Sequence, residues 1–289
     1  HYPHIYGLKS IFKDCEIHVL CSRKNVDLFR NLELVSKTLV YRSGKIFWKS
    51  LGLNEYDLFY NPKDHPSITA FKIAKKVKAK VKVCIADNQQ NQHYNYQLND
   101  DHVKLIIEKN CLLLREYDPT INLISWIPQI ETDKKISKQI CINISADSNY
   151  RIWPIEKWVN LIDLISRDDP STKINVFSMN KDQSKSKVLE KKFGNIIKKH
   201  TQFESILDST SIIQKSKIFI SSDTAMIHLS DAANTPILGL FSGDNKNLDR
   251  YKPFWTTHKI IQSDSLSICL LYKSPSPRDG LLSRMTSSA

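Results

Sequence analysis

The stretch Lys217–Phe241, KIFISSDTAMIHLSDAANTPILGLF, decides the fold of this 289-residue chain. Its apolar start, Lys217–Ser221, predicts a strand that ends in small polar residues, and a helix is expected from about Thr224 to Ala233. A second apolar run, Pro236–Phe241, predicts the next strand. A strand, a helix and a further strand in close succession are typical of a parallel sheet covered by helices.

The polar end of the first of these strands is a candidate anion site. In open α/β sheets, ligands bind at the carboxyl ends of strands, and the N–H groups of a helix N-terminus suit a phosphate. Asp223 and Thr224 lie at this junction, and His228 follows four residues after Thr224 on the same helix face. Ala225 is small enough for close approach. A structural alternative makes Asp223 only a helix cap and His228 a buried core residue.

A second junction of this kind lies in Asn143–Trp158, NISADSNYRIWPIEKW. A strand ends near Ser145, a loop carries Arg151, and Trp153 precedes a helix that starts with proline. Arg151 could neutralise a pyrophosphate, and the hydroxyl of Ser145 could donate a hydrogen bond. The structural alternative leaves Arg151 in solvent and packs Trp153 into the core.

The same alternation of strands and helices extends through the rest of the chain. Further strands are expected at Glu16–Cys21, Tyr56–Tyr60, Val81–Ile85, Gln139–Ser145, Lys173–Phe177 and Ile196–Ile197. Further helices are expected at Pro66–Lys78, Asp100–Leu114, Pro154–Ser166 and Lys185–Phe193. The charged run Gln129–Lys138 predicts a linker between two Rossmann-like domains, 1–130 and 139–268. Residues 269–289 lack any periodicity and are expected to be a non-native or disordered tail.

Composition narrows the function classes. Apolar residues make up 41% of the chain and charged residues 25%, which excludes a disordered or membrane-embedded protein. The six cysteines form no C-x-x-C pair and no zinc spacing, which predicts no metal and a reducing, cytoplasmic compartment. The net charge is +12, of which residues 1–138 carry +7. Nucleic acid, anionic lipid and phosphorylated small molecules are candidate partners, but no nucleic-acid motif is present.

Taken together, the two junctions resemble glycosyltransferase family 9, the ADP-heptose:lipopolysaccharide heptosyltransferases. The resemblance rests on Arg151-Ile152-Trp153-Pro154 and on Asp223-Thr224-Ala225-Met226-Ile227-His228-Leu229, followed by Thr235-Pro236 and Leu240-Phe241. It implies a GT-B architecture of two Rossmann-like domains with parallel sheets that face a cleft. It also implies inverting, metal-independent transfer of a heptose or related sugar from an ADP-sugar to a lipopolysaccharide inner-core acceptor, with no cofactor.

The resemblance implies roles for the residues around the helix N-terminus. Thr224 and the N–H groups around Ala225 would hold the donor diphosphate, and Arg151 would stabilise the leaving ADP. Asp223 would face the donor sugar, and His228 would support the diphosphate side. Ala225 stands where the family usually has glycine, which would crowd the approach of a phosphate and is consistent with an inactive paralogue.

Further residues are assigned by the same resemblance. Ser145 and Ala146 would line the nucleotide pocket, and Asp182 is the nearest candidate for the carboxylate that contacts the ribose. The general base is expected in a Gly-Asp motif upstream of His1. The first domain is then expected to lack its first strand, and this chain, without its base, is expected to be inactive or nearly so.

The basic first half has a matching interpretation. The acceptor is anionic and lies at the cytoplasmic face of the inner membrane, where peripheral contact is expected. Arg42, Lys63 and a lysine-bearing helix with Lys72, Lys75 and Lys76 could attract it. The alternatives are a solvated helix face, the same fold with another nucleotide sugar, and a non-catalytic protein that binds anions or nucleic acid.

Overall fold

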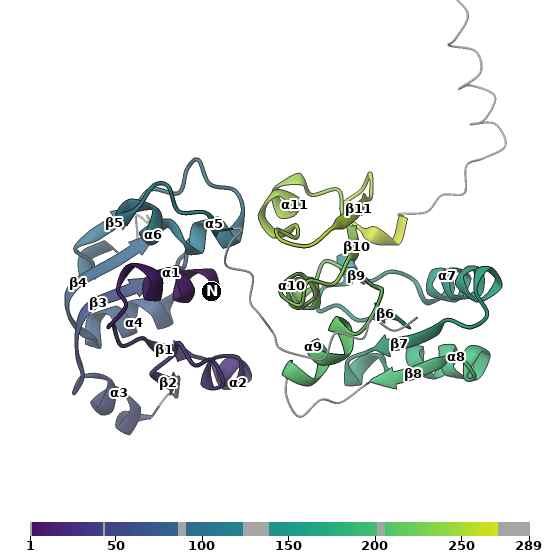
Figure 1. The fold of residues 1–289 in the computed structure, drawn as a ribbon, viewed down its shortest axis with the longest axis horizontal. Helices are drawn as coiled ribbons and strands as arrows, with labels where there is room; N and C mark the ends of the chain where they lie inside the picture. The colour runs from purple at the N-terminus through teal and green to yellow at the C-terminus, as the bar shows by residue number, and fades with distance from the viewer. Residues whose placement is uncertain (1, 43, 86–90, 124–138, 201–205, 271–289) are drawn as a thin grey trace, which may run out of the picture. The chain divides into compact units, whose positions relative to one another are not determined.

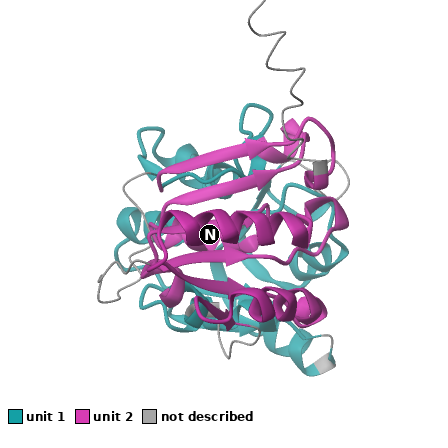
Figure 2. Ribbon diagram, turned by 90° about the vertical axis from the view of Figure 1, so that its right-hand side faces the viewer, with its two compact units in different colours: residues 1–131, 204–210, 249–255 teal, residues 132–203, 211–248, 256–289 magenta. Residues whose placement is uncertain are grey.

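The structure, a computed structural model, describes residues 2–42, 44–85, 91–123, 139–200 and 206–270 (Figure 1). The chain forms two compact units (Figure 2). Unit 1 contains residues 1–131, 204–210 and 249–255, and unit 2 contains residues 132–203, 211–248 and 256–289. Two short segments from the second half of the sequence therefore group with unit 1. The expected linker, Gln129–Lys138, lies outside the described residues.

Unit 2 contains a six-stranded parallel sheet in the order β11-β10-β9-β6-β7-β8. Its strands are β6 (Gln139–Asn143), β7 (Lys173–Phe177), β8 (Ile197–His200), β9 (Ile218–Ser222), β10 (Ile237–Phe241) and β11 (His258–Gln262). Its helices are α7 (Ile155–Asp168), α8 (Gln183–Phe193), α9 (Ile206–Gln214), α10 (Ala225–Ala232) and α11 (Asn245–Tyr251), of which α9 and α11 share residues with unit 1. The strand order reverses between β6 and β9, which makes this pair the topological switch point of the sheet.

Alternating side chains on the strands hold helices on both faces of this sheet. Ile142 of β6 packs with Trp158 and Ile162 of α7, and the same cluster includes residues of α8. The next residue along β6, Cys141, faces the other way and packs with Ile213 of α9. Successive strand residues point to opposite faces, so an apolar strand with helices on both sides is the expected outcome.

The helix α10 ends where the sequence contains a residue that tolerates a left-handed backbone. Asn234 has a φ of 53°, and the N–H of Thr235 donates to the carbonyl oxygen of Ser230 at 3.0 Å. This closing turn brings the chain directly into β10.

Unit 1 contains two small parallel sheets, β1-β2 and β3-β4-β5. The strands are β1 (His18–Cys21), β2 (Lys37–Val40), β3 (Glu55–Asn61), β4 (Lys78–Ile85) and β5 (Tyr96–Leu98). The helices are α1 (Tyr2–Ile11), α2 (Val26–Arg30), α3 (Lys45–Leu51), α4 (Ile68–Lys76), α5 (Ile106–Asn110) and α6 (Leu112–Tyr117). Short 3₁₀ turns are η1 (Arg23–Asn25) and η2 (Asn91–His93) here, and η4 (Asn149–Arg151), η5 (Asn180–Asp182) and η6 (Ile268–Leu270) in unit 2.

A buried cluster of charges lies within unit 1, between the loop after β3 and residues of α5 and α11. Both oxygens of Asp64 accept hydrogen bonds from the Arg250 guanidinium, and the Nη2–Oδ1 distance is 2.7 Å. Lys109 lies 3.3 Å from Asp64 and 2.5 Å from Asp100. The Asp64 side chain is only 3% exposed, so this carboxylate depends on its cationic partners.

The expected helix Asp100–Leu114 is wrong in its first part. The chain makes a turn in which the N–H of Val103 donates to the carbonyl oxygen of Asp100, and the helix begins only at Ile106. Asp100 does not cap a helix, because its carboxylate pairs with Lys109. Cys111 then separates α5 from α6 with φ −101° and ψ 7°.

Other predicted elements are confirmed with small shifts at their ends. The helix expected at Pro66–Lys78 spans Ile68–Lys76, and Lys78 already starts β4. The tail was expected to start at residue 269, but this boundary is too early. Cys269 lies in η6, and its carbonyl oxygen accepts a hydrogen bond from Lys157 at 2.7 Å. Residues 271–289 lie outside the described part of the chain. No helix in the described ranges combines the length and apolar character that a membrane span requires.

Candidate functional site

The two central strands of unit 2 end in polar residues that contact one another. Asn143, the last residue of β6, lies opposite Ser221 of β9 in the parallel register. The Asn143 amide nitrogen lies 3.1 Å from the Ser221 Oγ and 3.2 Å from the Thr224 Oγ1. It also donates to the carbonyl oxygen of Ser145 at 3.0 Å. One buried amide therefore fixes both strand ends at the switch point, where ligands bind in folds of this type.

Asp223 follows β9 and holds the guanidinium of Arg151. The Arg151 Nε lies 3.3 Å from the Asp223 Oδ2, which also accepts a hydrogen bond from the Asn247 amide at 2.6 Å. The Asn247 Oδ1 accepts from the Arg151 Nη2 at 3.3 Å and closes the triangle. The Asp223 side chain is 6% exposed, whereas that of Arg151 is 39% exposed. The arrangement buries the carboxylate and leaves part of the cation accessible to a ligand.

These contacts decide between the alternatives drawn from the sequence. Asp223 is not the cap of α10, because the N-cap position belongs to Thr224, whose backbone is extended, and the helix begins at Ala225. Arg151 is not a free solvated side chain. Trp153, in contrast, packs in the core, with its ring 4.9 Å from that of Trp158. Trp153 is therefore a core residue, as the structural alternative states, whereas Arg151 is not left in solvent and Asp223 does not cap the helix.

The first turn of α10 carries small residues at the same strand end. Ala225 is exposed at the first helical position, where the N–H groups of a helix face outward and favour an anion. His228 lies one turn further and is partly buried. Burial lowers the pKa of His228 below its ordinary value, against the opposing effect of Asp231 and Asp223. The imidazole is therefore neutral at pH 7 and can donate or accept a hydrogen bond.

A third group of residues lies beside the end of β6, in the loop after β7. The Ser145 Oγ accepts a hydrogen bond from the Met179 N–H at 2.9 Å, and the Ala146 carbonyl oxygen accepts from Lys181 at 2.8 Å. These bonds hold η5, in which Asp182 is 4% exposed. Its Oδ1 accepts from Lys185 at 2.6 Å, whereas its Oδ2 is buried without a hydrogen-bond partner.

An unpartnered buried carboxylate oxygen is rare, because its desolvation is not compensated by a hydrogen bond. A hydroxyl group of a ligand would satisfy this oxygen. The structure thus places all the residues expected at the site in unit 2, in two groups on either side of the end of β6: Arg151, Asp223, Thr224, Ala225 and His228 in one, and Ser145, Ala146 and Asp182 in the other.

Two residues of the site were not anticipated from the sequence. Asn143 lies two residues before the end of the predicted strand Gln139–Ser145, so its position near a strand end was a usable signal. Asn247 lies in α11, 24 residues after its partner Asp223, and no sequence pattern indicated that contact.

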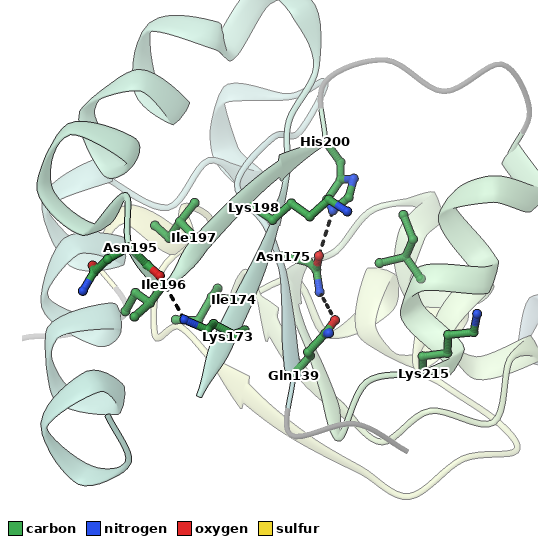
Figure 3. A pocket seen from close by; sticks show the side chains of 11 residues that line it. Gln139, Lys173, Ile174, Asn175, Asn195, Ile196, Ile197, Lys198, His200 and Lys215 are labelled. Atoms are coloured by element: carbon green, nitrogen blue, oxygen red, sulfur yellow. Dashed lines mark hydrogen bonds between the residues drawn. The ribbon is translucent and has the colours of Figure 1, made fainter. Parts of the chain in front are cut away.

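A separate pocket of about 310 Å³ lies on unit 2 near the starts of β6 and β7 (Figure 3). Within it, the amide of Asn175 donates to Gln139 at 2.8 Å, and its oxygen lies 2.8 Å from the His200 Nε2. None of the residues that line it belongs to the strand-end site, so this pocket does not extend that site.

The sheet order and the polar strand ends at its switch point define unit 2 as a Rossmann-like α/β domain with a ligand site at the strand ends. The model of glycosyltransferase family 9 (heptosyltransferase) matches residues 45–267. The chain belongs to this family. No curated protein sequence matches it significantly.

Solved structures agree on the fold. Escherichia coli heptosyltransferase WaaC with ADP superposes with a TM-score of 0.78 at 12% identity, over 98% of this chain and 93% of that one. A family 9 glycosyltransferase from Veillonella parvula gives 0.74 at 15% identity, over 91% and 81%. E. coli ADP-heptose lipopolysaccharide heptosyltransferase II gives 0.72 at 12% identity, over 98% and 92%. The fold is that of the GT-B glycosyltransferases.

Proposed function

We propose that unit 2 binds an ADP-sugar and that the protein transfers its sugar, a heptose or a close relative, to a lipopolysaccharide inner-core acceptor. The observation that carries the proposal is the position of the Arg151 guanidinium, held by Asp223 and Asn247 next to the start of α10. The family supports glycosyl transfer. Two of the similar structures are of WaaC with ADP and with ADP-2-deoxy-2-fluoro heptose, which supports the choice of donor.

In the proposed complex, the diphosphate lies at the N-terminus of α10. The N–H groups around Ala225 and the hydroxyl of Thr224 donate to its oxygens. When the bond between the anomeric carbon and the β-phosphate oxygen breaks, negative charge develops on ADP. Arg151 is placed to stabilise that charge, because Asp223 orients its guanidinium without covering it.

A fixed cation and a helix N-terminus supply the role that a divalent metal has in other nucleotide-sugar enzymes, so we propose that transfer is independent of metal. Within the described residues, no group of three or more His, Cys, Asp or Glu side chains is arranged to hold a metal ion. Neutral His228 supports the diphosphate side as a hydrogen-bond donor. The expectation that the general base lies upstream of His1 stays a prediction.

The nucleoside lies on the other side of the β6 end in this proposal. Ser145 and Ala146 line that side, and the buried Oδ2 of Asp182 accepts a hydrogen bond from a ribose hydroxyl. The acceptor, which carries phosphates and carboxylates, is drawn to the basic first half of the chain. We therefore propose that the enzyme acts in the cytoplasm, at the inner face of the membrane that holds the acceptor.

Calorimetric titration of the chain with ADP tests the donor site directly, because it needs no acceptor and no general base. We expect binding that is unchanged by EDTA and weakened in Arg151→Ala. Arg167→Ala removes an arginine on α7 that is 75% exposed and pairs with Asp163 of the same helix, and serves as the control. Failure of ADP to bind, or a requirement for added magnesium, would overturn the proposal.

The second candidate is the same fold with a different nucleotide sugar, because the sugar contacts few residues in this site. Competition among ADP, UDP and GDP distinguishes the two, since the contacts of Ser145 and Ala146 concern the nucleoside. A preference for UDP or GDP would favour the second candidate.

A further inference from the structure

The helix α3 of unit 1 exposes large apolar side chains to solvent. Ile46 is 87% exposed and Leu53, just after the helix, is 74% exposed. Ile46 lies in the first turn of the helix, and Leu53 follows its C-cap, Gly52. Leu51 is 3% exposed and anchors the helix to the core. Single exposed apolar residues are ordinary on protein surfaces, but this segment also contains a group of partly exposed aromatic rings.

Three aromatic side chains of the same segment contact one another. Tyr41, Phe47 and Trp48 are each partly exposed, and their rings meet edge to face at centroid distances of 5.1 to 6.1 Å. Their mutual contacts order the three rings in the free protein. Binding of a partner therefore costs little additional side-chain entropy. We call Tyr41, Ile46, Phe47, Trp48 and Leu53 the α3 patch.

The charges around the α3 patch are of one sign. The sequence from Leu34 to Asn54 contains Lys37, Arg42, Lys45 and Lys49 and no acidic residue. Arg42 and Lys49 are exposed.

A further cation reaches the patch from α4. The Lys76 side chain passes over Gly52, where an added Cβ would lie 3.1 Å from the Lys76 Cε. Glu55 is the nearest acidic residue in the sequence after the patch and pairs with Lys78 at 3.5 Å. The segment therefore combines exposed aliphatic and aromatic side chains with basic ones.

We propose that the α3 patch docks on the surface of an anionic lipid bilayer. Aliphatic side chains enter the boundary between headgroups and acyl chains, and aromatic rings of tyrosine and tryptophan prefer that depth. Lysine and arginine keep their charges at the headgroups, where each contributes about 1 kcal/mol. The proposal deepens the proposed function, because it specifies the face by which an enzyme with a membrane-held acceptor reaches its substrate.

Charge complementarity favours a bilayer over the other possible occupants. A second copy of this chain would bring the same basic residues against themselves. An acidic protein partner would pair with the basic residues. Charges at the rim of a protein interface act mainly through long-range attraction, however, so such a partner does not explain why Ile46 and Leu53 are exposed.

The test is co-sedimentation of the full chain with vesicles of phosphatidylcholine and phosphatidylglycerol, against vesicles of phosphatidylcholine alone. We expect binding to the anionic vesicles that falls roughly tenfold in the double variant Ile46→Ser/Leu53→Ser. Leu164→Ser/Leu266→Ser removes two equally exposed leucines of unit 2, 62% and 68% exposed, and is expected to bind like the wild type. Lys49→Glu is expected to weaken binding only to the anionic vesicles.

Three outcomes would overturn this proposal. In the first, the patch variant binds vesicles as well as the wild type does. In the second, the unit 2 control variant loses as much vesicle binding as the patch variant. In the third, light scattering shows that the patch variant loses self-association and not vesicle binding. Thermal unfolding of each variant confirms that it is folded. ADP titration separates the two proposals, because the patch variant is expected to bind ADP normally whether or not it binds vesicles.

Discussion

Arg151 and Asp223 form an ion pair that joins the loop after β6 to the end of β9, with 3.3 Å between Nε and Oδ2. The two residues come from opposite sides of the switch point of the sheet. Asn247 bonds to both of them and completes a closed triangle. The guanidinium is therefore fixed before any ligand arrives, which lowers the entropic cost of binding a diphosphate.

Removal of this guanidinium is expected to weaken ADP binding. Arg151→Ala should lose roughly 10-fold to 100-fold in affinity, because it removes a charge-assisted contact and leaves Asp223 as an unpaired negative charge near the phosphates. Arg151→Lys should keep part of the affinity, since it restores the charge but not the planar contacts. Calorimetric titration measures both variants. An Arg151→Ala variant with the affinity of the wild type would remove Arg151 from the site.

The buried Oδ2 of Asp182 is expected to select for a ribose. The wild type should bind ADP more tightly than 2′,3′-dideoxy-ADP, and Asp182→Asn should bind the two with nearly equal affinity. The free energy of unfolding should fall modestly in this variant, because the amide loses the charge that pairs with Lys185 at 2.6 Å, and urea unfolding checks that it is folded. Persistent discrimination between the two nucleotides in Asp182→Asn would assign ribose recognition elsewhere.

The stability of unit 1 is expected to depend on pH through His4. Burial lowers the pKa of His4 to about 3, and its ring lies 4.7 Å from that of Tyr60. The unfolded chain binds a proton near pH 6.5 and the folded chain does not, so stability is lost as the pH falls below about 6.5, by about 1.4 kcal/mol per pH unit. His4→Phe should flatten this dependence in denaturant titrations, whereas His102→Phe, at an exposed position, should not.

The stabilisation by the pair of Asp64 and Arg250 is expected to be lost at a lower pH than the stabilisation that depends on His4. Burial raises the pKa of Asp64, but hydrogen bonds from Arg250 and His65 and the charges of Arg250 and Lys109 outweigh it and hold the pKa well below its usual range. The stabilisation is therefore present above about pH 4 and is lost as the pH falls further.

Asp64→Asn tests this pair at neutral pH. It should lower the free energy of unfolding by about 3 kcal/mol, because it leaves buried cations without their carboxylate. Asp57→Asn is the matched control, since Asp57 pairs with Lys80 on the surface, where ion pairs contribute little. Equal effects of the two substitutions in urea unfolding would contradict the importance of burial.

The fold of unit 2 could be predicted because its signals are local. Strands such as Lys173–Phe177 are short apolar runs, and the proline at 154 marks the start of α7. The strand-end residues followed from the same rule, since parallel strands place their carboxyl ends on one edge. Asp223 and Arg151 could thus be named as site residues, although their direct contact could not.

The rest depended on side-chain contacts that local periodicity does not indicate. The Asp100 carboxylate pairs with Lys109, nine residues on, instead of capping the helix, so a helix was predicted where a turn occurs. The grouping of residues 249–255 with unit 1 depends on Arg250 and its partner Asp64, 186 residues apart. Local periodicity carries no information about such pairs.

Gly243, the second residue after β10, is expected to tolerate no side chain. A Cβ there would lie 2.8 Å from the carbonyl oxygen of Ser263 and 2.9 Å from that of Ser265, and backbone atoms cannot move aside as a flexible side chain can. Gly243→Ala should therefore lower the free energy of unfolding by about 1–3 kcal/mol. Gly44→Ala is the control, because an added Cβ at Gly44 meets nothing within 4 Å. Urea unfolding of both variants measures the difference, and a Gly243→Ala variant as stable as Gly44→Ala would show that the loop after β10 can open without cost.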